Sequence, residues 1–570
     1  MPSSVLDSSI NASTDSVASH PQHSARPAEP VSARPRIGFV SLGCPKNLVD
    51  SEVMMGLLDR AGGELTPRAE DADILVVNTC SFIDSAKQES VNTILEMVEH
   101  KRERGGRAQR LIVAGCLVER YRDEIRRNIP EVDAVVGTGE LEAILEAAGL
   151  SAPAAPAAHS SPFNILVSRA PSAVHQHSHP TEIGAQLEHS HGTQSRAATR
   201  SDSLDAKSSR PEGDARERTG RFSRAQWAGA TAALPEYLYT DQTPRILTTP
   251  RSSAYIKIAE GCDHPCSFCI IPQLRGKFRS RRLQSIVAEA ENLIAQGVRE
   301  ITLIGQDTTC YGEDLGIRDG LSTLLESLAA LPGLRWLRFL YAYPNKITTR
   351  LLETIAGHDN IAKYLDVPLQ HASPSVLKRM KRGGTPEVFL RLIEKARATV
   401  PGIALRTSFI VGFPGVTDAD FRQLCVFVTQ AQLDWLGVFS YSDEEGAAAF
   451  SLDAALKVPR RTIESRRRRL MKLQQKISRK AKAAWVGREV DLLVEGESAE
   501  TPLLWEGRTP LHAPEIDGKV LINDFGPHET LVPGTFYRAE ITESHAYDVV
   551  ARIYWNNSSQ VARWTSDAFE

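Results

Sequence analysis

The sequence has no run of about 20 consecutive apolar residues, which is the length that a membrane-spanning helix needs. The first 35 residues also lack the short apolar core of a secretory signal peptide, so we expect a cytoplasmic protein that makes no membrane contact. A strong excess of one charge is missing too, because the formal net charge is -3, and no uniformly basic surface for nucleic acid is predicted. Cysteine is scarce: 8 thiols in 570 residues are too few for a disulfide scaffold, and their grouping favours metal binding or catalysis.

The sequence does contain enough apolar material for several cores, with 42% hydrophobic and 24% charged residues, and its length predicts about three to four domains. Residues 1–35 and 148–247 are rich in Ser, Ala, Pro and His without periodicity, which predicts a disordered extension and a disordered insert or linker. Within the insert, a solvated loop is favoured over a metal site for His175, His177 and His179. The predicted domains are 36–147, 248–484 and 485–556, followed by a tail at 557–570.

Apolar runs alternate with helical patterns in the first predicted domain, which indicates a β-α-β-α-β order and a parallel sheet. The predicted strands are 36–42, 73–78, 111–114 and 133–136, and the predicted helices are 49–61, 84–103 and 120–128. Cys44, Cys80 and Cys116 each follow one of the first three strands. Because the carboxyl ends of parallel strands share one edge, where open α/β sheets bind ligands, these thiols are expected to converge in a way that suits a cluster. The alternative is three small residues buried at strand ends.

A second group of cysteines follows the strand predicted at 254–259. Cys262, Cys266 and Cys269 have the spacing C-x3-C-x2-C, and three thiolates so close can hold three irons of a four-iron cubane. No fourth cysteine follows, which leaves one iron open to an outside ligand and indicates a catalytic site. The alternative is a zinc site with His264 as the fourth ligand, although structural zinc sites more often use separated cysteine pairs.

Six strand-like runs in the central domain, each followed by a helical pattern, predict a partial (β/α)6 barrel. The runs are 254–259, 299–304, 336–341, 364–369, 403–411 and 434–440, and the clearest helical patterns are 283–296 and 420–431. Ligands of such barrels bind at the carboxyl ends of the strands. Cys262, Gln306, Gln370 and Gly412 fall at those ends.

A C-x3-C-x2-C loop that opens a series of β/α units resembles the radical S-adenosylmethionine superfamily, and the upstream cysteines resemble the methylthiotransferases within it. Further motifs match this family in order: Gly43-Cys44-Pro45-Lys46-Asn47, Val77-Asn78-Thr79-Cys80, Val113-Ala114-Gly115-Cys116, Gln273-Leu274-Arg275-Gly276, Gly305-Gln306-Asp307-Thr308-Thr309, Tyr341-Ala342-Tyr343-Pro344, Pro368-Leu369-Gln370-His371 and Gly412-Phe413-Pro414-Gly415. The Cys-Pro-Lys-Asn and Gln-Asp-Thr-Thr forms resemble the RimO-type branch, which modifies the small-subunit ribosomal protein number twelve. Relatives that modify tRNA usually carry Cys-Gln-Met-Asn and Gln-Asn-Val. The extension and the insert depart from the family pattern.

The resemblance implies an enzyme with two 4Fe-4S clusters and S-adenosylmethionine as cofactors. The cluster that cleaves S-adenosylmethionine to a 5'-deoxyadenosyl radical would be ligated by Cys262, Cys266 and Cys269. A second cluster, whose free iron carries the sulfur, would be ligated by Cys44, Cys80 and Cys116. A saturated carbon offers no acidic or electrophilic handle, which explains the need for a radical cofactor. The implied product is β-methylthioaspartate, and the implied electron donor is a reduced flavodoxin- or ferredoxin-like protein.

The resemblance also implies contacts with S-adenosylmethionine. Phe268 would lie against the adenine, with a place in the apolar core as the alternative, and Gly305 and Gln306 would help to position the cofactor. Cys310 and Cys425 belong to neither group of cysteines, and we predict a packing role for both.

Residues 460–483 hold eleven Lys and Arg against the single acid Glu464, with apolar residues at helical spacing: Ile463, Leu470, Leu473 and Ile477. A basic amphipathic helix of this kind is able to contact ribosomal RNA, although charge runs are usually solvated faces.

The last predicted domain, 485–556, resembles a TRAM module, a small all-β barrel of the OB type, with turns at 495–497 and at Asp517-Gly518. Residues 485–570 carry 6 Lys+Arg and 15 Asp+Glu, and this acidic balance favours a basic ribosomal protein over a phosphate backbone as the partner. Two alternatives stay open. One is a tRNA adenosine methylthiotransferase with the same chemistry, and the other is a non-catalytic iron-sulfur or RNA-binding protein.

Overall fold

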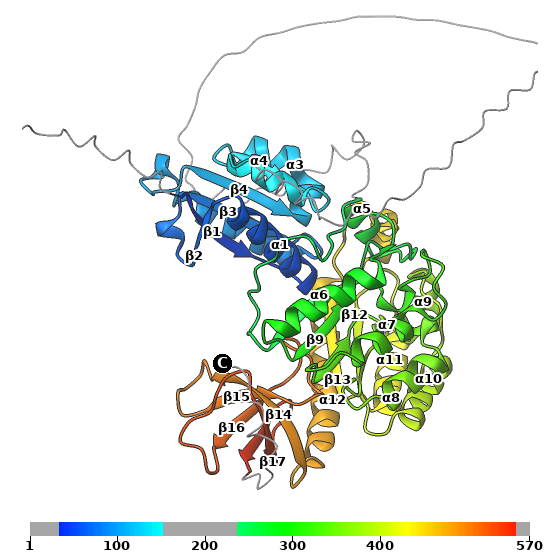
Figure 1. Cartoon of the computed structure of the whole chain (residues 1–570). Helices are drawn as coiled ribbons and strands as arrows, with labels where there is room; N and C mark the ends of the chain where they lie inside the picture. The colour runs from blue at the N-terminus through cyan, green and yellow to red at the C-terminus, as the bar shows by residue number, and fades with distance from the viewer. Residues whose placement is uncertain (1–33, 152–235, 555–570) are drawn as a thin grey trace, which may run out of the picture.

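The computed structural model describes residues 34–151 and 236–554. It contains an N-terminal parallel sheet, a partial β/α barrel and a small closed β-barrel, in that order along the chain (Figure 1). The predicted fold class is therefore confirmed. Most of the predicted extension, most of the predicted insert with its three histidines, and the tail lie outside the described residues. None of the helices in the described part is long and apolar enough to span a membrane.

The N-terminal sheet has the strand order β2-β1-β3-β4-β5, and all of its pairs are parallel. Its strands are β1 (Arg36–Ser41), β2 (Glu64–Thr66), β3 (Ile74–Thr79), β4 (Arg110–Gly115) and β5 (Ala134–Val136). Its helices are α1 (Pro45–Arg60), α2 (Asp84–Val98), α3 (Cys116–Asn128) and α4 (Ile144–Ala148). The central strand β3 is buried throughout, as its continuous apolar run predicts. The edge strand β2 was not predicted, because three residues are too few to show a periodic pattern.

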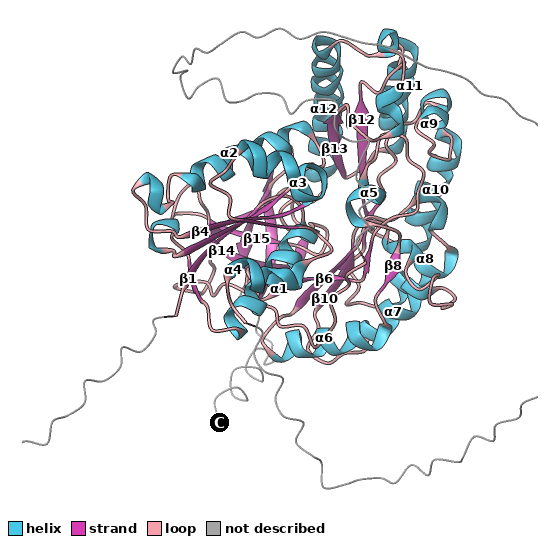
Figure 2. Cartoon of the chain, turned by 90° about the horizontal axis from the view of Figure 1, so that it is seen from above, coloured by secondary structure: helices cyan, strands magenta, loops and turns pink. Residues whose placement is uncertain are grey.

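The barrel consists of two parallel three-stranded sheets, β6-β9-β10 and β11-β12-β13, which an isolated bridge between Leu337 and Ile361 joins. Its strands are β6 (Ser253–Lys257), β9 (Glu300–Ile304), β10 (Trp336–Phe339), β11 (Tyr364–Asp366), β12 (Ala404–Val411) and β13 (Trp435–Ser440). The outer helices form an arc around these strands (Figure 2). They are α6 (Leu283–Ala295), α7 (Gly320–Ala329), α8 (Thr349–Gly357), α9 (Pro374–Arg379), α10 (Pro386–Thr399), α11 (Asp418–Ala431) and α12 (Arg460–Ala483). After β6 come β7 (Ala259–Glu260), the helix α5 (Ile271–Arg275) and β8 (Arg279–Ser280). The two short strands β7 and β8 form an antiparallel pair.

The C-terminal module is a closed barrel with the strand order β14-β15-β16-β18-β17. Its strands are β14 (Glu489–Glu497), β15 (Trp505–Arg508), β16 (Val520–Asp524), β17 (Phe536–Ser544) and β18 (Val549–Ile553). The turn predicted at 495–497 is wrong, because β14 continues through these residues. The register against β15 shifts between Val494 and Gly496, so the glycine serves a β-bulge inside the strand.

The C-terminal module packs against the amino ends of the barrel strands. Arg508 forms an ion pair with Glu300, the first residue of β9, at 2.6 Å. Tyr364, the first residue of β11, donates a hydrogen bond from its hydroxyl to Asp517 at 2.7 Å. Burial alone would raise the pKa of Glu300, but Arg508 and Arg338 lower it to about 2. The module therefore lies at the end of the barrel opposite to the carboxyl ends, where ligands of such barrels bind.

Residues 236–247, the last part of the predicted linker, are packed between the first two domains. The Tyr239 side chain is 2% exposed. The Arg245 guanidinium pairs with Glu52 of α1 at 2.6 Å and with Glu289 of α6 at 2.7 Å. The prediction of a disordered linker is therefore wrong for this part of the chain. Its composition gave no indication of a core because buried ion pairs, rather than an apolar run, hold much of it in place.

Candidate active site

Three cysteines from the N-terminal sheet, which we call the upstream trio, meet at its carboxyl edge: Cys44, Cys80 and Cys116. Each follows β1, β3 or β4, and these strands are neighbours in the sheet. Gly43 has a φ of 97°, and a Cβ at this position would lie 2.8 Å from Cys80 Cβ, so only glycine allows this approach of the two loops. Burial raises the pKa of the Cys116 thiol to about 12, Arg275 opposes this shift, and the neighbouring Cys80 and Cys44 add to it.

The second group of cysteines, the loop trio, stands between β7 and α5: Cys262, Cys266 and Cys269. The preceding Gly261 has a φ of 79°, and a Cβ there would lie 2.0 Å from the carbonyl oxygen of Lys277. The backbone at the start of the loop therefore packs directly against the backbone at Lys277, just before β8. Burial raises the pKa of the Cys269 thiol to about 12, and the nearby Cys266 and Cys262 add to this shift. All of these thiols are free.

The two trios lie across the interface between the N-terminal sheet and the barrel. Cys116 packs against Ile270 and Leu274, and Ile270 directly follows Cys269 of the loop trio. Thr138, at the carboxyl edge of the sheet, donates a hydrogen bond to the Leu274 carbonyl at 2.7 Å. The structure thus brings both sequence-predicted groups of cysteines to one region of the molecule.

His264, the fourth ligand in the zinc alternative, is engaged elsewhere. Its Nε2 lies 2.5 Å from a carboxylate oxygen of Asp307, and its ring stacks on Tyr343 with centroids 3.8 Å apart. The Cys310 thiol donates to the same Asp307 oxygen at 3.1 Å, and the potential ligand atoms of His264, Asp307 and Cys310 all lie within 4.8 Å of one another. Burial, reinforced by Asp307, raises the pKa of Cys310, which keeps that sulfur a hydrogen-bond donor. Cys425 packs against the barrel core, as predicted.

The residues expected to contact S-adenosylmethionine lie next to the loop trio. Phe268 is half-buried and packs against an apolar cluster that includes Met380 and Phe413. A Cβ at Gly305 would meet no atom closer than 3.6 Å, so its protein neighbours do not require a glycine there. Gln306 donates a hydrogen bond to Glu260 at 2.6 Å, while its own Oε1 is buried and has no partner among the described residues. Such an acceptor is available to a bound ligand.

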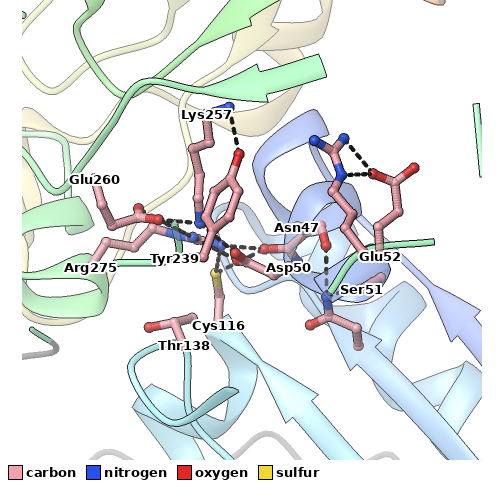
Figure 3. Close-up of polar contacts among 12 residues, drawn as sticks. Asn47, Asp50, Ser51, Glu52, Cys116, Thr138, Tyr239, Lys257, Glu260 and Arg275 are labelled. Carbon is pink, nitrogen blue, oxygen red and sulfur yellow. Dashed lines mark hydrogen bonds and ion pairs between the residues drawn. The ribbon is translucent and has the colours of Figure 1, made fainter. Parts of the chain in front are cut away.

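A buried group of four charged residues, the bridging network, extends from Cys116 of the upstream trio to Glu260, two residues before Cys262 of the loop trio (Figure 3). It consists of Asp50, Lys257, Glu260 and Arg275. Arg275 donates to Asp50 at 2.9 Å and to Asn47 at 2.5 Å, and it lies 3.5 Å from the sulfur of Cys116. It also pairs with Glu260 at 3.2 Å.

Burial would raise the pKa of Glu260, but Lys257 and Arg275 hold it well below its ordinary range, so this carboxylate stays ionised and accepts the bond from Gln306. The motif that contains Arg275 matches the family pattern, but nothing in the sequence indicated that Arg275 pairs with Asn47 and Asp50 of α1.

The comparisons with known proteins agree with this division of the chain. Residues 36–137 match the model of uncharacterized protein family UPF0004, residues 256–428 that of the Radical SAM superfamily, and residues 486–553 that of the TRAM domain.

A relative from Koribacter versatilis, described as ribosomal protein uS12 methylthiotransferase RimO, is 63% identical over 92% of this chain and 97% of its own length. A relative of the same description from Solibacter usitatus is 52% identical over 91% of this chain and 94% of its own length. Among solved structures, the radical S-adenosylmethionine methyltransferase TsrM from Kitasatospora setae matches 71% of this chain and 72% of its own, with 16% identity and a TM-score of 0.42.

Proposed function

The chain belongs to the family of ribosomal protein uS12 methylthiotransferases named RimO, and on this premise we propose that it attaches a methylthio group to the β-carbon of an aspartate in uS12. The family membership makes it a radical S-adenosylmethionine transferase. The observation that carries the proposal is the meeting of the two cysteine trios at one interface, where Cys116 contacts Ile270 beside the loop trio. A reaction that removes a hydrogen atom and then adds sulfur to the same carbon needs two such centres within reach of one substrate.

We further propose that each trio holds a 4Fe-4S cluster, and the donor sets fit such clusters. Each offers three free thiols close together, and thiolates are the ligands that iron-sulfur clusters prefer. When bound, the cluster at the loop trio supplies the electron that cleaves S-adenosylmethionine, and the one at the upstream trio supplies sulfur. The electron itself would come from a reduced flavodoxin- or ferredoxin-like protein.

The surrounding residues of the chain would bind and orient the cofactor. We propose that Phe268 flanks the adenine, and that Gly305 leaves room for the cofactor to approach the backbone. Gln306, oriented by its bond to Glu260, would present its free Oε1 to S-adenosylmethionine. Because Glu260 belongs to the bridging network, the position of Gln306 depends on Arg275, which also contacts Cys116.

A competition experiment tests the proposed substrate. The reconstituted enzyme, S-adenosylmethionine and a reductant are incubated with equal amounts of uS12 and tRNA, and both are then analysed by mass spectrometry. We expect the mass increase of one methylthio group on an aspartate of uS12 and none on tRNA. Modification of adenosine in tRNA with uS12 unchanged would instead establish the alternative, a tRNA methylthiotransferase, with the radical chemistry intact.

We also propose a contact between α12 and ribosomal RNA when the substrate is in the assembled subunit. The helix packs its apolar side on β13 and α11, while its basic side chains face outward. The exposed ones are Arg460, Arg461, Arg467, Arg468, Arg469, Lys472, Lys476, Arg479 and Lys480. Ile463 near its start contacts Gly412 at the carboxyl end of β12, so the basic face begins close to the site end of the barrel.

A double charge reversal, Lys472→Glu with Lys476→Glu, is expected to slow methylthiolation of uS12 in intact small subunits several-fold and to spare isolated uS12. Each lost phosphate contact weakens binding. It also lowers, by about one, the slope of the logarithm of the binding constant against the logarithm of the salt concentration. The measurement is the modification rate at several salt concentrations. Arg391→Glu with Lys395→Glu, an equally spaced exposed pair on α10, is the matched control. An equal decrease of the modification rate on intact subunits and on isolated uS12 would contradict an RNA contact.

A further inference from the structure

Lys46 of α1 is a buried lysine that forms no ion pair with an acidic side chain of the described residues. Its side chain is 9% exposed, and its ammonium lies 3.1 Å from the centroid of the Tyr341 ring. Within residues 34–151 and 236–554, no carboxylate lies within 4.0 Å of this nitrogen, and it donates no hydrogen bond. An aromatic face attracts an ammonium, but it does not satisfy three N–H donors.

The other buried lysines and arginines of the described chain show how unusual this is. All but Lys482 have a carboxylate within 4.0 Å. Lys482 lies between two indole rings, those of Trp435 and Trp485, far along α12. A buried charge without a partner is costly, so the surroundings of Lys46 suit an anion that arrives from outside the chain.

The two acidic residues whose charge acts on Lys46, Glu260 and Asp366, are already paired with cations. Asp366 pairs with Arg406 at 2.8 Å, and Glu260 pairs with Lys257 at 2.5 Å and with Arg275. The positive charge of Lys46 is therefore not consumed by an ion pair with either of these residues.

Lys46 also lies beside the upstream trio and contacts a segment that reaches the loop of the second trio. It is two residues after Cys44 of the upstream trio. Its aromatic neighbour Tyr341 is two residues before Tyr343, whose ring stacks on His264, a residue of the same loop as the loop trio. Tyr341 has a φ of 65°, unusual for a tyrosine, and its backbone N–H donates a hydrogen bond to the side-chain carboxylate of Asp366 at 3.0 Å. The ring beneath Lys46 is thus fixed in a segment that leads from one trio to the other.

We infer that Lys46 binds the side-chain carboxylate of the substrate aspartate. This inference rests on the proposed function, in which the β-carbon, one bond from that carboxylate, must reach both trios. The carboxylate would complete the ion pair that Lys46 lacks and would place the β-carbon at the interface.

The test measures binding of two fluorescent uS12 peptides. One contains the target aspartate in its unmodified form, and the other has asparagine in its place. The full-length reconstituted enzyme is used without reductant, so that no turnover occurs. Wild-type protein should bind the aspartate peptide about 10- to 100-fold more tightly, the range of a charge-assisted bond. Lys46→Met, which keeps the length of the stem, should bind both peptides equally weakly, and Lys46→Arg should restore part of the preference.

Lys482→Met is the matched control, because it removes another buried lysine that lacks a carboxylate partner. This variant should keep the wild-type preference for aspartate. If Lys46→Met or, should that variant fail to fold, Lys46→Gln keeps the preference, the inference is overturned. A wild-type protein that binds neither peptide and modifies tRNA would instead reject the proposed function, which separates the two failures.

Discussion

With Cys262, Cys266 and Cys269 replaced by alanine, the reconstituted protein should lose about half of its iron and form no deoxyadenosine from S-adenosylmethionine. The reason is that only this loop trio adjoins the cofactor-binding candidates, among them Gln306 with its free buried oxygen. Alanine at the upstream trio should remove the other half of the iron and spare cleavage of S-adenosylmethionine, but it should abolish methylthiolation. Iron analysis, chromatography of deoxyadenosine and mass spectrometry of uS12 measure the three quantities.

Cys425→Ala controls for the loss of a thiol as such, since Cys425 packs on the barrel core, away from both trios. It should retain the iron content and both activities. Identical loss of all iron and all cleavage from either triple replacement, in proteins that remain folded by circular dichroism, would refute two centres with separate roles.

Much of the fold was predictable because the sheets of the first two domains are buried on both sides. Strands such as β3 and β9 are buried along their whole length and are rich in apolar residues, and their ends determine where residues such as Cys80 and Gln306 lie. Given a parallel sheet, the meeting of the upstream trio follows from neighbouring strand ends. The β/α alternation likewise predicted the partial barrel.

The sequence could not predict which charged residues pair across domain boundaries. Arg275 and Asp50 are separated by 225 positions, and Arg245 and Glu52 by 193, so no local pattern reports either contact. Ion pairs between distant segments form only after the domains have packed, and helix or strand periodicity carries no information about them. The position of the acidic module at the amino ends of the barrel strands, through Arg508 and Glu300, was unpredictable for the same reason.

The position of the module also changes how its charge is interpreted. Its acidic balance predicted a basic protein partner, but the module lies opposite to the carboxyl ends, whereas Lys46 and the trios lie at the interface with the N-terminal sheet. A substrate that reaches the trios would contact the module only by extending along the barrel. The exposed basic face of α12, which runs from Gly412 to the module, is the surface that connects the two ends.

Arg275→Met is expected to separate the two halves of the reaction, because this guanidinium contacts both the upstream trio, at Cys116, and the carboxylate that orients Gln306. Deoxyadenosine should still form, but the yield of methylthio product per deoxyadenosine should fall at least tenfold. The free energy of unfolding should also fall by about 3–5 kcal/mol, since Lys257 would be the one cation of the described residues left in an ion pair with Asp50 and Glu260. Chemical denaturation and the product ratio measure the two effects.

A neighbouring arginine provides the control for this change. Arg279 is half-buried but donates only to backbone carbonyls, at 2.6 Å to Lys277, so Arg279→Met should cost about 1 kcal/mol and leave the product ratio unchanged. Adding Asp50→Asn to Arg275→Met should recover part of the lost stability, because it removes a carboxylate that the first change left unpaired. A purely structural role of Arg275 predicts that stability falls while the product ratio stays at the wild-type value, and that result would contradict the coupling of the two trios through the bridging network.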